Sequence, residues 1–177
     1  MNLLLLDSSE LSPDKSTILL GRRAEHICQV LLLKTGSILR AGIVNGEHGD
    51  AEITHINTTK TEVSLLFTPY QNNTQQLNPT PLPITVIMAL PRPKVAKRLI
   101  AVCAECGVKE LHFINSFRVE KSFWQSPLLN PENIHQQLLL GLEQSKDTAL
   151  PIVSLHPRFK PFVEDQLAAI NSNKDCF

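Results

Sequence analysis

Two clusters of basic side chains offer the clearest chemistry in this sequence. Arg22, Arg23 and His26 lie within about one turn at the start of a predicted helix. Cations at a helix N-terminus oppose the helix dipole, so their placement favours a functional role. Guanidinium groups and unpaired helix N–H groups together bind phosphate. The pattern predicts an RNA contact; the alternative is a pair of ordinary exposed arginines.

A second basic cluster follows the first two strands of a predicted parallel sheet. Ligands of open α/β sheets bind at the carboxyl ends of the strands. Cations that gather at this edge therefore favour a partner that carries phosphate groups. Six residues form this predicted RNA-binding rim: Arg92, Lys94, Lys97, Arg98, Arg118 and Lys121.

The common catalytic signatures are missing, so the catalytic residues remain unassigned. Cys103 and Cys106 form a Cys-x-x-Cys near the end of a helix, where the dipole disfavours a thiolate, and we expect a structural role. A zinc site needs two further ligands, and the six histidines show no ligand spacing. Glycine-rich phosphate loops and a Gly-x-Ser-x-Gly elbow are also absent. We predict no metal site and no cofactor-binding residue in this chain.

Charge is balanced over the whole chain but not along it. The 177 residues include 17 Lys or Arg and 17 Asp or Glu. Residues 71–121 alone carry seven Lys or Arg against three Asp or Glu, which suits a phosphate-bearing partner. An apolar run long enough for a membrane helix is absent, and the short apolar start lacks a basic leader. We therefore predict a cytoplasmic protein without a membrane partner.

Residues 1–70 have the pattern of a small β-barrel that contains one helix. The dipeptide Asn45-Gly46 is a strong hairpin turn. Ala51, Ile53 and His55 alternate along one side of a strand. Strands are predicted at 3–6, 17–20, 37–44, 50–57 and 61–67, with a helix at 21–34.

A polar stretch rich in proline separates this barrel from a second domain. Residues 69–83 cannot continue a sheet, because proline lacks an N–H donor, and we place the linker at 71–83. After it, strands alternate with helices, which predicts an incomplete open α/β domain with a parallel sheet at 84–177. Its strands are predicted at 84–90, 108–114 and 151–155, and its helices at 94–106, 131–145 and 161–170.

Taken in order, these residues resemble the bacterial 16S ribosomal RNA uracil-N3 methyltransferase family. Each motif is weak alone, but five in the right order are fairly specific, and they cover about residues 1–160. The matching segments are Arg22-Arg23-x-x-His26-Ile27-x-x-Val30-Leu31-x-x-Lys34-x-Gly36, Leu82 to Pro91 with Lys94 and Lys97, Glu105-x-Gly107-Val108, Ser116-x-Arg118, and Glu143-Gln144-Ser145 with Pro151.

The resemblance implies a SPOUT-class methyltransferase with a PUA-like RNA-binding barrel. Family members are homodimers, and S-adenosylmethionine binds in a deep trefoil knot, a rare exception to the rule against knots. The reaction would methylate N3 of a uridine in small-subunit ribosomal RNA. This needs an unpaired base and donors for the charge that develops on the ring oxygens. Arg118 fits either such a donor or a phosphate contact.

Two departures from the family pattern stand out. The family usually has Glu-Gln-Ser-x-Arg, whereas Asp147 takes the arginine position here. The Gly-Pro-Glu-Gly-Gly loop and the Leu-Gly-x-x-Ile-Leu-Arg-x-Glu-Thr-Ala stretch, which build the knot and the cofactor pocket, are absent and would lie beyond Phe177. We therefore expect S-adenosylmethionine to bind the full-length parent and not this chain.

Three hypotheses follow from these observations. The first is the RNA-binding front part of a uridine-N3 methyltransferase that lacks its knot region. The second is a non-catalytic RNA-binding module with a degenerate α/β domain. The third is an unrelated α/β enzyme that acts on small molecules and has no affinity for RNA.

Overall fold

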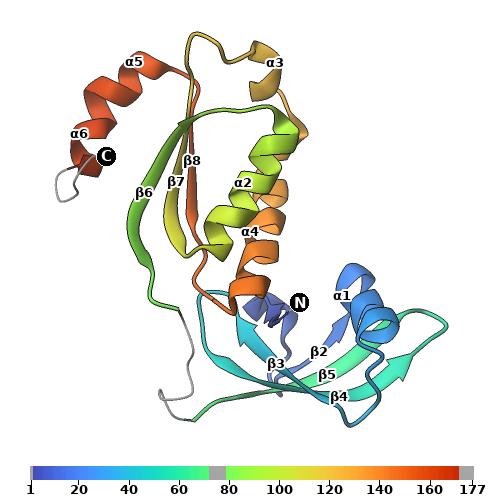
Figure 1. The fold of residues 1–177 in the computed structure, drawn as a ribbon. Helices are drawn as coiled ribbons and strands as arrows, with labels where there is room; N and C mark the ends of the chain where they lie inside the picture. Colours follow the sequence, from blue (N-terminus) through green and yellow to red (C-terminus); the bar gives the residue numbers. More distant parts are fainter. Residues whose placement is uncertain (1, 72–78, 172–177) are drawn as a thin grey trace. The chain divides into compact units, whose positions relative to one another are not determined.

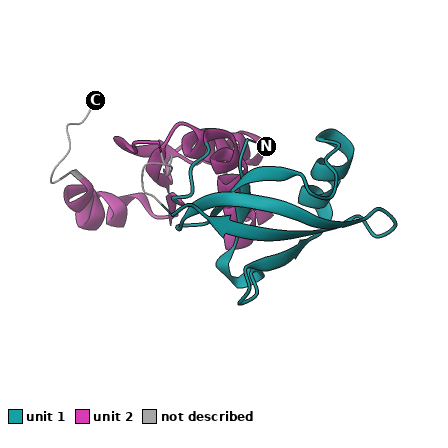
Figure 2. Cartoon of the chain, turned by 90° about the horizontal axis from the view of Figure 1, so that it is seen from below, with its two compact units in different colours: residues 1–78, 146–149 teal, residues 79–145, 150–177 magenta. Residues whose placement is uncertain are grey.

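The chain divides into two compact units. The computed structural model describes residues 2–71 and 79–171. Unit 1 comprises residues 1–78 and 146–149, and unit 2 comprises residues 79–145 and 150–177 (Figure 2). Most of the linker predicted at 71–83, residues 72–78, lies outside the described residues.

Unit 1 is a curled sheet of five strands with the short helix α1 and a 3-10 helix at Ser8–Glu10 (Figure 1). The strands run in the order β1-β3-β4-β5-β2, with β1 parallel to β3 and the other pairs antiparallel. This half-barrel confirms the predicted fold class of the first domain. Its elements are β1 (Leu4–Leu6), β2 (Ser16–Leu19), α1 (Gly21–Glu25) continued by a π-helix (His26–Val30), β3 (Ile38–Ile43), β4 (His48–Asn57) and β5 (Glu62–Pro69).

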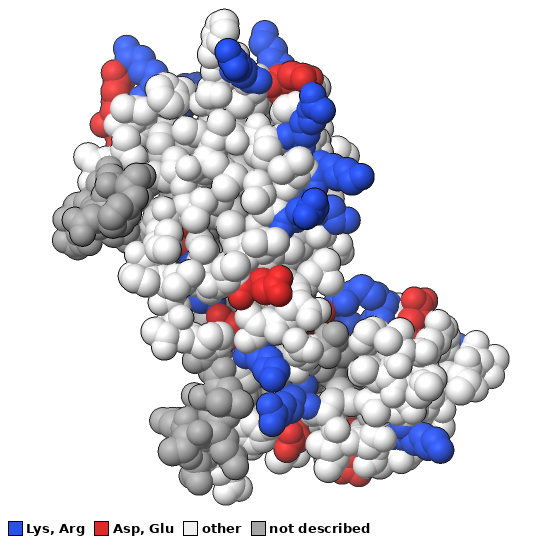
Figure 3. Space-filling model, in the orientation of Figure 1, with Lys and Arg blue, Asp and Glu red and all other residues white. Residues whose placement is uncertain are grey.

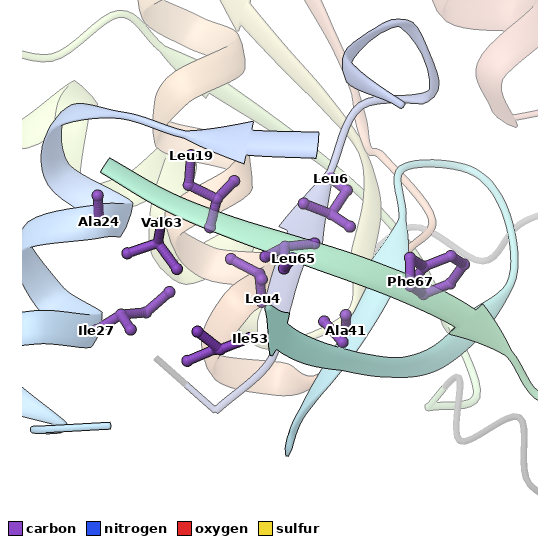
Figure 4. Packing of buried hydrophobic residues seen from close by; sticks show 11 residues of the cluster. Leu4, Leu6, Leu19, Ala24, Ile27, Ala41, Ile53, Val63, Leu65 and Phe67 are labelled. Atoms are coloured by element: carbon purple, nitrogen blue, oxygen red, sulfur yellow. The ribbon is translucent and has the colours of Figure 1, made fainter. Parts of the chain in front are cut away.

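The core of unit 1 follows the alternation of the strands. Alternate residues of β5 point inward and meet the inward side chains of the neighbouring strands (Figure 4). Ala24 and Ile27 bring the helix onto the same core. The buried cluster consists of Leu4, Leu6, Leu19, Ala24, Ile27, Ala41, Ala51, Ile53, Val63, Leu65 and Phe67.

A bulge in β4 corrects the predicted side for His55. Ile53 pairs with Leu65, but the register shifts after it, so that His55 pairs with Ser64. The extra residue reverses the alternation, and Ile56 packs against the core while His55 is exposed. Sequence alternation cannot reveal such a shift.

Residues 146–149 belong to unit 1, although the sequence analysis assigned them to the second domain. Thr148 Oγ1 donates a hydrogen bond to the carbonyl oxygen of Gly46 at 2.9 Å. The backbone N–H of Asn45 donates to the carbonyl oxygen of Thr148 at 2.7 Å. These bonds attach the segment to the turn between β3 and β4.

Unit 2 is a parallel three-stranded sheet in the order β6-β7-β8. Two successive right-handed crossovers in one direction put their helices on the same face, and α2 and α4 cover one face together (Figure 1). The predicted open α/β domain is confirmed. Its elements are β6 (Leu82–Ala89), α2 (Pro93–Glu105), β7 (Val108–Ile114), α3 (Lys121–Trp124), α4 (Pro131–Ser145), β8 (Ile152–His156), α5 (Phe159–Pro161), a π-helix (Phe162–Gln166) and α6 (Leu167–Asn171).

Strand β6 begins earlier than the sequence predicted. It includes Pro83, although the proline-rich stretch was expected to exclude a strand. Its register against β7 is irregular between Leu82 and Thr85. An edge strand tolerates proline, because one side of its backbone needs no partner.

Two helix boundaries also differ from the prediction. The first helix ends at Val30 and not at Lys34, because Leu32 has a left-handed backbone (φ 52°). The last helical segment begins at Phe159, before the predicted start at Pro161.

Helices α2 and α4 approach each other closely at Gly141. A Cβ atom on Gly141 would lie 2.7 Å from the Cβ of Ala104 and still closer to the carbonyl oxygen of Ala101. Only glycine therefore permits this separation of the two helices.

We expect Gly141→Ala to destabilise the protein. Alanine improves helix propensity by about 1 kcal/mol, but the clash with the Ala101 backbone should outweigh this and leave a net loss of about 1–3 kcal/mol. Urea unfolding followed by circular dichroism measures the change. Gln136→Ala, at an exposed position of the same helix, is the control, and equal stability of the two variants would contradict the packing argument.

Candidate nucleic-acid interface

A stripe of cations runs along the exposed side of α2. Lys94, Lys97 and Arg98 are spaced three and four residues apart, so they share one face of the helix, and all three are exposed. Arg92 precedes the helix and is also exposed. Figure 3 shows Lys and Arg side chains gathered along one side of the upper body, which is unit 2. We call these four residues the α2 stripe.

The opposite face of α2 is apolar and fixes the orientation of the stripe. Ala96, Ile100, Cys103 and Ala104 are buried. Their side chains hold the helix against the rest of unit 2, so the cations must face solvent. The α2 stripe makes no ion pair with any carboxylate in the described part of the chain. Its charge is therefore available to an anionic partner.

Arg118 and Lys121 come from the loop after β7 and the start of α3. Both are exposed. Ala89 at the end of β6 pairs with Ile114 at the end of β7. The segments that follow the two strands therefore begin at the same edge of the sheet. Helix α2 then runs back from that edge, so Arg98 lies roughly 9 Å along the helix axis from Arg92. The six cations extend from this edge along α2; their role in RNA binding stays a prediction.

The cluster of Arg22, Arg23 and His26 lies in unit 1, and Arg23 is already engaged there. Arg23 Nη1 donates to Glu10 Oε2 at 2.9 Å and to the carbonyl oxygen of Leu5 at 2.9 Å, and Nη2 completes the pair with Glu10. Burial raises the pKa of the Glu10 carboxyl, but the bonds from Arg23 and the Asp7 backbone outweigh it and lower that pKa overall. Arg23 thus has a structural role, which the sequence did not predict.

The other two members of this cluster differ in exposure. Arg22 is exposed, and His26 is half-buried. The Nε2 atom of His26 is buried and has no hydrogen-bond partner among the described residues. The RNA contact assigned to Arg22, Arg23 and His26 remains a prediction.

A polar network that the sequence analysis missed crosses the sheet of unit 2. Thr85 Oγ1 donates to Glu110 Oε2, and the other carboxylate oxygen of Glu110 lies 3.1 Å from His112 Nε2. His112 Nδ1 lies 2.9 Å from His156 Nε2, and the two rings stack. Phe162 contacts both rings. The alternation along β7 places Glu110 and His112 on one face, but the sequence does not show which residue of β8 meets them.

The two cysteines of the Cys-x-x-Cys differ in their surroundings. Cys103 is buried and Cys106 exposed, with no disulfide between them. Burial, and then the nearby Cys106, raises the pKa of the Cys103 thiol, which disfavours the reactive thiolate. Within residues 2–71 and 79–171, no group of three His, Cys, Asp or Glu side chains is arranged to hold a metal ion.

Asp147, which takes the usual arginine position of the resembled family, is buried. Its Oδ1 accepts a hydrogen bond from the backbone N–H of Ala149 at 2.8 Å. The side chain therefore stabilises the backbone of residues 146–149 and presents no charge at the surface.

A cavity of about 590 Å³ opens beside the loop after β7. The sequence predicts Lys121 in this region but does not show that α3, the loop and the start of α5 bring three aromatic residues together. The cavity is lined by Asn115, Ser116, Phe117, Val119, Lys121, Trp124 and Phe159.

Comparison with known proteins shows to which protein family unit 2 belongs. An RNA methyltransferase domain family matches residues 78–174, which is more than half of the chain. The chain belongs to this family of RNA methyltransferases. The third hypothesis, an unrelated small-molecule enzyme, is therefore wrong.

The relatives narrow the class to the small-subunit ribosomal RNA methyltransferases that the sequence resembles, and that resemblance is confirmed. The chain is 30% identical over 137 residues to ribosomal RNA small subunit methyltransferase E of Treponema pallidum, covering 77% of this chain and 49% of that protein. It is 28% identical over 160 residues to methyltransferase E 1 of Borreliella burgdorferi, covering 90% and 63%. The chain thus spans about half to two thirds of these relatives.

A solved structure confirms the fold. Ribosomal RNA small subunit methyltransferase E from Neisseria gonorrhoeae, bound to S-adenosylmethionine, superposes with a TM-score of 0.69 at 17% identity. The match covers 94% of this chain and 65% of that one. In the described part of this chain, no helix is both long and apolar enough to cross a membrane.

The described cavity does not fit S-adenosylmethionine. The cofactor carries a carboxylate, a sulfonium and an ammonium cation, and a ribose diol, and acidic side chains bind its cations and the diol well. Among the described residues, no carboxylate lines the cavity, and the one charged residue in its lining is Lys121, a cation.

The His112–His156 contact predicts a pH-dependent stability. Burial, and then the proximity of His112, lowers the pKa of His156. The unfolded chain therefore binds a proton more readily than the folded chain, and stability should fall as the pH drops below about 6.5. Urea midpoints at pH 7.5 and pH 5.5 measure the effect.

His156→Gln should reduce this pH dependence, because it removes the titrating group. His55→Gln, an exposed position in unit 1, is the matched control. A parent and a His156→Gln variant with the same loss of stability at low pH would refute the role of His156.

Proposed function

We propose that this chain is the RNA-binding part of an enzyme that methylates N3 of a uridine in small-subunit ribosomal RNA, with S-adenosylmethionine as the methyl donor. The observation that carries the proposal is the α2 stripe, an exposed row of cations on an RNA methyltransferase domain. Phosphate contacts supply most of the affinity of such proteins for RNA. The printed names of the relatives support ribosomal RNA as the partner.

The reaction sets requirements for the RNA. The N3–H of uracil lies on the pairing edge, so the base must be unpaired or turned out of its helix. Loss of the N3 proton leaves charge on the ring oxygens, which donors must stabilise. Arg118 is exposed beside the cavity and can be such a donor or a phosphate contact.

The same proposal includes a cytoplasmic location with the small ribosomal subunit as partner, and homodimers of the full-length protein. The second candidate is a non-catalytic RNA-binding module. The absence of a carboxylate from the described cavity lining favours it, because these residues do not fit the methyl donor. The two candidates share RNA binding and differ in cofactor binding.

Reversing the charge of the three cations of the α2 stripe that lie on the helix itself should weaken RNA binding and reduce its salt dependence. Affinity falls as salt rises, and each phosphate that the parent neutralises makes this fall steeper. We expect the triple variant Lys94→Glu, Lys97→Glu, Arg98→Glu to make the slope of log affinity against log salt less steep, by roughly 0.7 to 0.9 for each phosphate contact that is lost. Filter binding to fragments of small-subunit ribosomal RNA at rising salt measures this slope.

The control is Lys60→Glu, which reverses one exposed cation in the turn between β4 and β5 of unit 1. It changes net charge without touching the α2 stripe. If parent and triple variant bind with the same affinity and slope, the α2 stripe does not contact RNA.

Isothermal titration of the 177-residue chain with S-adenosylmethionine should give no binding. The reason is the cationic lining of the described cavity, which contains no carboxylate, together with the absence of the Gly-Pro-Glu-Gly-Gly loop from the sequence. The positive control is a full-length relative that contains this loop. Micromolar affinity of the 177 residues would show that they hold the cofactor by themselves.

A further inference from the structure

The cavity beside the loop after β7 has the dimensions of a ligand site. Its volume of about 590 Å³ falls within the range of about 300–1,000 Å³ that is usual for small-molecule sites. It also adjoins the carboxyl end of a parallel strand, where open α/β sheets bind ligands. The residues that line it therefore indicate what it binds.

Three of the seven residues that line this cavity are aromatic. The chain contains one Trp and seven Phe, and the Trp and two of the Phe residues line the cavity. Phe117 is fully exposed, and Phe159 is about half exposed. A single exposed apolar residue is ordinary, but several around one cavity mark a binding surface. Their flat rings fit a flat ligand.

Trp124 is held in place by a polar contact. Its indole Nε1 donates to Asn115 Oδ1 at 3.3 Å. The backbone N–H of Asn115 donates to the carbonyl oxygen of His156 at 3.0 Å, which anchors Asn115 to β8. The only hydrogen-bond donor of the indole is thus used, and its ring offers the cavity a stacking surface. Among the described residues, none accepts a hydrogen bond from the side-chain N–H groups of Asn115, so these can donate to the edge of a ligand.

The charges around the cavity select an anionic ligand. Lys121 lines it, and Arg118 is exposed next to Phe117. Among the described residues that line the cavity, none carries a carboxylate. An acidic peptide would suit the cations but not the aromatic rings, whereas RNA carries flat bases on a phosphate chain.

We propose that this cavity holds one unpaired base of an RNA strand, stacked against Phe117, Trp124 and Phe159, while Arg118 and Lys121 contact the adjoining phosphates. Base–aromatic stacking with a cationic backbone path is the general mode of single-strand binding. The proposal rests on the proposed function, because it requires that the chain binds RNA.

The single tryptophan makes the site directly observable. Trp124 is the only Trp in the chain, so its fluorescence reports on the surroundings of this one residue, which also borders a neighbouring cavity that Phe117 does not line. A short oligouridylate should quench it, and an abasic strand with the same backbone should bind without quenching. Equal quenching by uridine monophosphate or by polyglutamate would overturn the assignment to an RNA strand.

Substitutions then test the stacking itself. Phe117→Ala and Trp124→Ala should each weaken oligouridylate binding about five- to a hundredfold in a filter assay. Trp124→Phe should restore most of the affinity, because phenylalanine also stacks. Phe117 is fully exposed, so its removal leaves the fold intact. Ile38→Ala, at an exposed position of β3 in unit 1, is the matched control.

The outcomes separate this inference from the proposed function. If the parent binds RNA with a steep salt slope but Phe117→Ala and Trp124→Ala bind equally well, the base site is wrong and the RNA-binding function stands. If the parent binds no RNA even at low salt, both fail. A selective loss in the alanine variants, with rescue by Trp124→Phe, supports the base site.

Discussion

The close packing of α4 on α2 at Gly141 is the constraint on which the rest of unit 2 depends. No Cβ fits between the two helices there, and the close approach sets Ala101 and Ala104 of α2 against α4. This packing buries Ala96, Ile100 and Ala104 and leaves the opposite side in solvent. The cations of the α2 stripe lie on that opposite side. Packing in the interior therefore determines where on the surface these cations lie.

The two faces of the parallel sheet have different chemistry, because helices cover one of them. The face under α2 and α4 is apolar, with Leu111 and Phe113 buried. The other face carries the network of Glu110, His112 and His156, in which each polar side chain finds a partner. Partnered polar groups avoid the penalty of burying a group without a hydrogen bond. The contact between His112 and His156 also joins the last residue of β8 to β7. The carbonyl oxygen of His156 in turn accepts a hydrogen bond from Asn115, which lines the cavity.

The two basic clusters found in the sequence are physically different. Arg23 donates its guanidinium N–H groups to Glu10 and to the backbone of β1, which stabilises unit 1. The cations of the α2 stripe have no such carboxylate partner within the described residues. Both clusters are basic residues close together in the sequence, which does not show their partners, so only the structure distinguishes a structural arginine from one available to RNA.

The sequence by itself determined the order of strands and helices, the fold class and the family, because these follow from local periodicity and from motifs in a fixed order. Tertiary structure decided the bulge before His55, the membership of residues 146–149 in unit 1, and the partners in each site. His112 and His156 are 44 positions apart and meet only through the register of β7 and β8. The aromatic cavity likewise joins residues from separate elements. Local spacing carries no information on such register, so these contacts could not be predicted from the sequence.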